Sequence, residues 1–131
     1  MLSTGSRNRF REARVRMKPT EKMVEIDDLL THVWMVRTFL KHSEEAEEDE
    51  DLQKVHRLLY DYMHALGVFW DQRDAEGYIE QASRKWHRLR NAKDEFINLQ
   101  PEISTHMNFQ MARRSLQTAV DRIGRILGTL T

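Results

Sequence analysis

The sequence predicts an all-α protein, an antiparallel up-down-up-down four-helix bundle that follows a basic N-terminal arm. Its 131 residues include only two prolines, Pro19 and Pro101. From Pro19 onward, apolar residues recur at spacings of three and four, and no alternating run is long enough to predict a strand. Short connections make consecutive helices antiparallel neighbours, which favours this bundle. An extended helical hairpin that completes its core by dimerising is the alternative architecture.

Both prolines are predicted to open helices. Proline suits the first helical position, because its missing N–H would have no partner there in any case. Glu21 and Glu102 follow the two prolines closely. Their negative charges favour the positive end of a helix, so both positions read as helix starts.

Four segments are expected to be helical, and they cover residues 20–42, 50–71, 74–99 and 102–129. On helical wheels, the large apolar side chains of each segment gather mainly on one arc. The three tryptophans, Trp34, Trp70 and Trp86, fall on these arcs. All three are therefore predicted to lie in the core.

The connections between the segments allow two interpretations at one place. Ser43 and the acidic residues 44–51 form either an acidic loop or the capped first turn of the second helix. Residues 71–74, with Gly77 just beyond them, predict the break before the third helix.

Charge divides the chain into two parts, although the net charge is zero. Residues 1–18 carry six basic and one acidic side chain, a balance of +5, and residues 19–131 carry −5 from 15 basic and 20 acidic side chains. We expect a disordered basic arm over 1–18 and a single helical domain over 19–131. The arm could instead hold phosphates or anionic lipid, or fold back on the acidic body. Nucleic acid is expected to bind, if at all, only through the arginines of the arm, Arg7, Arg9, Arg11, Arg14 and Arg16.

The sequence lacks the motifs that are typical of several function classes. The chain has no cysteine, which excludes disulfides and cysteine nucleophiles and fits a cytoplasmic location. No Glu precedes a His by three residues, so the ligand pair of a helical di-iron site is missing. Glycine-rich phosphate loops, Gly-x-Ser-x-Gly turns and His-Glu-x-x-His motifs are also missing. We therefore expect no enzyme, no metal and no cofactor. With no apolar stretch near the ~20 residues of a membrane span, we expect no membrane partner.

A second apolar stripe lies behind the main arcs of the first and last helices. Its members are Met35, Phe39, Ile103, Met107 and Met111. If Phe109 faces the core, the members on the last helix face outward, and methionine-rich patches are typical of adaptable interfaces. The stripe is predicted to bind a second copy or another helical protein. The alternatives are a wide core or a patch that the arm covers.

Polar side chains also interrupt the apolar arcs near one end of the bundle. They are Arg37, His56, Lys93, His106 and Arg113. The first four lie roughly 6–9 Å from that end along the helix axes, and Arg113 lies deeper. Together they could hold a small anionic ligand. Alternatively, the cations reach water or pair with nearby acidic side chains, or the opposite phase of the last helix separates the cluster.

The sequence as a whole favours a non-catalytic helical interaction or scaffolding module that forms a homodimer. The alternative function is a ligand-binding bundle that holds a small anion in the polar cluster. These two functions predict different surfaces, one apolar and one cationic.

Overall fold

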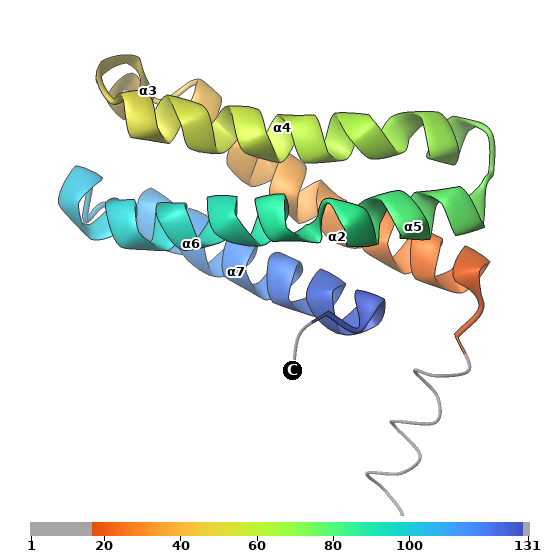
Figure 1. The fold of residues 1–131 in the computed structure, drawn as a ribbon. Helices are drawn as coiled ribbons and strands as arrows, with labels where there is room; N and C mark the ends of the chain where they lie inside the picture. Colours follow the sequence, from red (N-terminus) through yellow and green to blue (C-terminus); the bar gives the residue numbers. More distant parts are fainter. Residues whose placement is uncertain (1–16, 130–131) are drawn as a thin grey trace, which may run out of the picture.

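The computed structural model describes residues 17–129, which form six helices and no strand (Figure 1). The helices are α2 (Pro19–Lys41), α3 (Glu44–Glu48), α4 (Glu50–Asp71), α5 (Ala75–Arg84), α6 (Trp86–Ile103) and α7 (Met107–Leu127). The prediction of an all-α protein is therefore confirmed. Most of the predicted basic arm, residues 1–16, lies outside the described residues.

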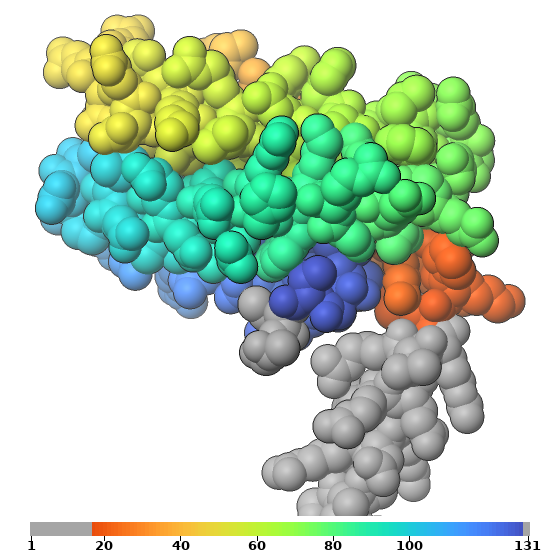
Figure 2. All heavy atoms as spheres, in the orientation of Figure 1, coloured from red at the N-terminus to blue at the C-terminus, as the bar shows by residue number. Residues whose placement is uncertain are grey.

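The four longest helices surround one core. α2 contacts α4 and α7, and α6 also contacts α4 and α7. α5 packs against α2 and α4 and leads into α6, so α5 and α6 follow one another along α4 (Figure 1). Figure 2 shows α4 and the α5–α6 pair packed side by side on the face in view.

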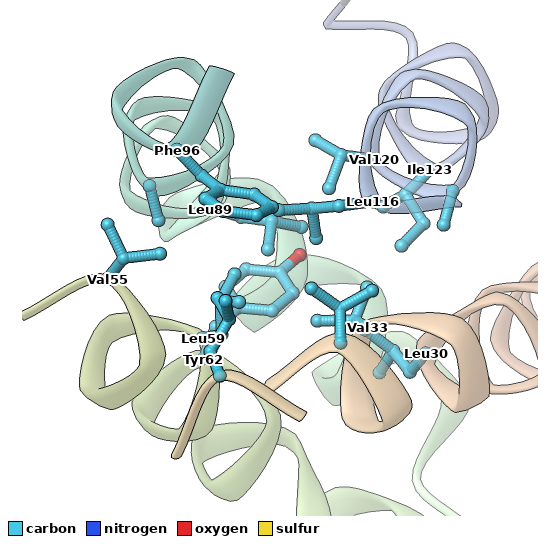
Figure 3. Packing of buried hydrophobic residues seen from close by; sticks show 14 of the residues in the cluster. Leu30, Val33, Val55, Leu59, Tyr62, Leu89, Phe96, Leu116, Val120 and Ile123 are labelled. Carbon is cyan, nitrogen blue, oxygen red and sulfur yellow. The ribbon is translucent and has the colours of Figure 1, made fainter. Parts of the chain in front are cut away.

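The core is continuous and apolar. Figure 3 shows Val33 of α2, Leu59 of α4, Phe96 of α6 and Leu116 of α7 converging from four sides. All four side chains are fully buried. Burial of one such side chain contributes about 1.5–3 kcal/mol, so this shared core is the main source of stability.

Residues at the start of each helix determine where the first helices begin. α2 begins at Pro19 as predicted, with proline at the start of the helix. The Ser43 hydroxyl accepts a hydrogen bond from the Ala46 amide, and the Asp49 carboxylate accepts one from the Leu52 amide at 2.9 Å. The acidic stretch is therefore a one-turn helix followed by the capped start of α4.

The predicted break before the third helix is confirmed. α4 ends at Asp71, and Arg73 takes a left-handed backbone conformation with φ of 55°. The Asp74 carboxylate then accepts a hydrogen bond from the Gly77 amide at 3.0 Å and caps α5. The chain reverses direction over these few residues (Figure 1).

The third predicted segment, residues 74–99, is not one helix. It is divided at Lys85, which ends α5 and precedes α6, and it extends further along the chain to Ile103. Together with the extra turn of α3, this division accounts for six helices in the described residues where four were expected.

The prediction that Pro101 opens the last helix is wrong. Pro101 lies in the last turn of α6. Proline in a helix removes the hydrogen bond to the carbonyl four residues earlier and bends the helix there. Because α6 ends two residues after Pro101, a bend displaces little of the helix, and Ile103 still packs against the core. α7 instead begins at Met107, after His106 Nδ1 accepts a hydrogen bond from the Asn108 amide at 3.0 Å.

The phase of the last helix is settled by burial. Phe109, Leu116 and Val120 are buried, whereas Met107 and Met111 are exposed. The alternative phase, with the methionines facing inward, is therefore wrong.

Candidate functional site

An open apolar groove of about 560 Å³ lies between α2 and α4. We call it the α2–α4 groove. Its lining residues include Thr31, Trp34 and Met35 from α2, and Tyr60, Gly67 and Trp70 from α4. Its volume falls within the range of pockets that bind small ligands.

Large apolar side chains stand exposed along this groove. Trp34 is 45% exposed, Met35 66% and Tyr60 37%. Trp86 is buried as predicted and Trp70 is half-buried, but the prediction that Trp34 lies in the core is wrong. Trp34 lies at the edge of the apolar arc of α2, and its ring turns toward Tyr60, with centroids 6.4 Å apart.

Arg37 holds the aromatic rim of the groove together. Its Cζ lies 4.9 Å from the ring centroid of Trp34 and 4.8 Å from that of Tyr60. Such contacts stabilise by about 0.5–1 kcal/mol each at exposed sites. Tyr60 also stacks on His64, with centroids 5.6 Å apart and ring planes 13° apart. The rim is thus ordered by contacts within the protein itself.

Gly67 leaves open space at the floor of the groove. It lies inside α4, where glycine costs about 1 kcal/mol relative to alanine. A Cβ added at Gly67 would meet no atom of residues 17–129 within 4 Å, apart from its own neighbours in the chain. No neighbouring atom therefore requires glycine at this position, and the missing side chain deepens the groove.

Carboxylates lie at one end of the groove, where Asp27 and Asp71 are among the lining residues. The Asp27 carboxylate accepts a hydrogen bond from the Tyr78 hydroxyl at 3.2 Å. Partial burial nevertheless raises the pKa of Asp27, and the negative charge of Asp28 adds to this effect.

Cations lie at the other end, beyond Trp34 and Tyr60. Burial lowers the pKa of His56, and the positive charges of Arg37, Arg57 and Lys41 lower it further. Arg37, Arg57 and Lys41 therefore make this end of the groove positive, whereas the lowered pKa leaves His56 mainly uncharged near neutral pH. At the opposite end, the Cζ of Arg73 lies 4.9 Å from the ring centroid of Trp70, and its charge partly offsets those of the carboxylates.

The predicted interface residues lie on two flanks of α2. Met35 lines the α2–α4 groove, whereas Met111 lines a separate groove between α2 and α7. Phe39 and Ile103 are half-buried against the core, and the Phe39 ring packs edge-on against Phe109 with centroids 5.0 Å apart. Met107 is exposed on α7.

The predicted anion-binding residues lie in three places. Arg37 and His56 come together at the cationic end of the α2–α4 groove. Lys93 instead pairs with Asp94 at 2.8 Å and with Asp121 at 3.5 Å.

The remaining two predicted anion-binding residues lie near the connection between α6 and α7. Arg113 donates a hydrogen bond to the side-chain oxygen of Gln100 at 3.3 Å. His106 is exposed and caps α7. Within residues 17–129, no group of three or more His, Asp or Glu side chains is arranged to hold a metal ion.

Sequence reasoning missed the α2–α4 groove because it predicts different places for the residues that line it. The helical wheels predict that Trp34 lies in the core and that Met35 belongs to a stripe shared with the last helix, and Tyr60 is not among the predicted site residues. The available signal was Gly67, a glycine inside a strongly helical segment that no turn explains.

Comparisons with known proteins add no relative. No family model matches the sequence, and neither the curated proteins nor the solved structures include a match. Within the described part of the chain, the helices are too short or too polar to cross a bilayer.

Proposed function

We propose that this protein is a non-catalytic helical interaction module that self-associates through exposed apolar side chains. We further propose that its helices act as one up-down bundle, in which α5 and α6 together take the place of the third helix. The observation that carries the proposal is the α2–α4 groove, where Trp34, Met35 and Tyr60 are exposed side by side.

The composition of the groove supports this function. Aromatic side chains and methionine are enriched at protein interfaces, and contiguous exposed apolar surface is costly unless a partner covers it. Because Arg37 contacts the rings of Trp34 and Tyr60, less side-chain entropy remains to be lost on binding. The groove is therefore suited to receive a helix.

The alternative function, a site for a small anion, has less support. The five predicted residues are divided among three places, and Lys93 and Arg113 already have partners within the protein. Only Arg37 and His56 lie together, at the cationic end of the α2–α4 groove, where burial and the charge of Arg37 lower the pKa of His56.

Solution mass tests the proposal directly. Light scattering after size-exclusion chromatography, across a range of protein concentrations, is expected to give twice the chain mass of 15.7 kDa. Met35→Glu should shift the mass to that of one chain while the helical circular dichroism is retained. A single-chain mass for the unaltered protein at every concentration would refute self-association.

A matched variant locates the surface. Met107→Glu combined with Met111→Glu places the same charge on exposed methionines of α7. We expect this variant to remain a dimer. If it dissociates while Met35→Glu does not, self-association stands and its surface is the α7 part of the predicted stripe.

A further inference from the structure

We infer that the α2–α4 groove binds the same groove of a second copy, with the two α2 helices antiparallel across a two-fold axis. This inference rests on the proposed self-association and adds its surface and its geometry. Three features of the groove carry it, namely its charge distribution, its shape and the register that these two require.

The charge distribution of the groove is complementary to itself. At one end, the carboxylates of Asp27 and Asp71 outnumber the nearby guanidinium of Arg73. At the other end lie Arg37 and Lys41. A two-fold axis through the middle of the groove places the acidic end of each copy against the cationic end of the other. A parallel arrangement would bring like charges together, which opposes association.

The shape of the groove is also complementary to itself. Met35 is the most exposed of its apolar side chains, and open space lies above Gly67 on the facing helix. Methionine is flexible enough to fill an irregular space. Because a two-fold axis acts on both copies at once, each Met35 would enter the space above Gly67 of the other copy.

One register satisfies both requirements. If Asp27 lies opposite Arg37 of the second copy, the two-fold axis crosses α2 at the level of position 32, midway between these two residues. Met35 of the second copy then lies opposite position 29 of the first. Trp34 of α2 lies beside Tyr60 of α4, and the two helices run in opposite directions. Gly67, seven residues after Tyr60, therefore lies beside position 27, seven residues before Trp34. The two positions differ by two residues, or about 3 Å along the helix axis, which a methionine side chain spans.

Cysteine cross-linking tests this geometry in the full chain, which has no cysteine of its own. Thr31 is exposed, lines the groove and lies one residue from the inferred axis. Thr31→Cys should form a disulfide between copies under mild oxidation, because residues beside the axis approach their own counterparts. The matched control is Asn98→Cys, which is exposed on α6 and should not cross-link.

Filling the space above Gly67 provides a second measurement. Gly67→Leu should raise the dimer dissociation constant at least about tenfold, because the new side chain occupies the space that Met35 of the other copy requires. Val68→Leu adds a methylene group at the next position, which is exposed and outside the groove lining, and should leave the constant unchanged.

The outcomes separate the inference from the proposed function. A dimer that cross-links through residue 31 and is weakened by Gly67→Leu supports the inference. A dimer that does neither overturns this geometry and leaves self-association intact. A protein that stays monomeric at every concentration overturns both.

Discussion

The hydroxyl of Tyr62 donates a hydrogen bond to the backbone carbonyl of Ala82 across 3.0 Å, joining α4 to the last turn of α5. Carbonyls in the last turn of a helix lose their usual partners, and the Tyr62 hydroxyl supplies one. Burial raises the pKa of this hydroxyl well above its usual range, so it remains a donor at ordinary pH. The bond ties the end of α5, just before the break at Lys85, to the neighbouring helix.

Tyr62→Phe should lower the free energy of unfolding by about 1–2 kcal/mol, because it leaves the buried Ala82 carbonyl without this partner. Urea unfolding followed by circular dichroism measures the change. Tyr60→Phe is the control, because the exposed Tyr60 hydroxyl forms no hydrogen bond within residues 17–129. Measured in the Met35→Glu background, which removes the contribution of dimerisation, it should change stability by less than about 0.5 kcal/mol. Equal effects of the two substitutions would show that the bond to Ala82 contributes nothing.

The all-α fold could be predicted because apolar residues recur along the chain at the spacing of a helix. The starts at Pro19 and after Asp74 depend on the residues beside them, so they could be recognised in the sequence. The division at Lys85 could not, because residues 82–88 contain neither glycine nor proline to mark it. The Tyr62 hydroxyl that pairs with the Ala82 carbonyl beside this division comes from another helix. The prediction that Pro101 opens the last helix failed for a similar reason, because α6 continues past the proline to Ile103, which packs against the core.

The candidate site was predicted only in part. Met35 was recognised as exposed because it lies clearly off the apolar arc of α2. Trp34 was assigned to the core, because a wheel gives only the direction of a side chain and not how far the neighbouring helix reaches. The contact of Arg37 with two rings joins residues from different helices, so it required the packing of α2 on α4 to be known.

His56 should make stability depend on pH. Its pKa is lowered in the folded protein, chiefly by burial and then by Arg37, so unfolded chains bind the proton more readily. The stability that comes from holding His56 neutral in the folded protein is therefore fully present above the pKa of the unfolded chain, about 6.5. It is lost as the pH falls from there through the lower pKa of the folded protein. Free energies of unfolding at fixed protein concentration, between about pH 5 and 8, should decline more steeply toward acid in the unaltered protein than in His56→Gln. Parallel curves for the two proteins would contradict this assignment.

Gly67→Ala and Gly77→Ala should change stability in opposite directions. A Cβ at Gly67 meets nothing, so alanine should stabilise α4 by about 1 kcal/mol through its higher helix propensity. A Cβ at Gly77 would clash with the Asp74 carboxylate that caps α5 and would lie 2.7 Å from the Phe69 ring, so alanine there should destabilise. Both are measured by urea unfolding in the Met35→Glu background, which removes the contribution of dimerisation. A loss of stability with Gly67→Ala would mean that the groove floor is occupied within the monomer.

The charge of Lys93 should be dispensable for stability, whereas the charges of its partners Asp94 and Asp121 should not. Its side chain is only 11% exposed, and its ammonium group is paired with Asp94 and Asp121. Lys93→Met keeps the apolar stem and removes the charge, so stability should stay within about 1 kcal/mol or rise. Asp94→Asn combined with Asp121→Asn leaves a mostly buried ammonium group without a counter-charge and should cost about 1–3 kcal/mol, less than a fully buried pair because Asp94 is half-exposed. Thermal and urea unfolding measure both variants. If Lys93→Met proves the more damaging change, the ion pairs are net stabilising and the packing of the Lys93 stem is secondary.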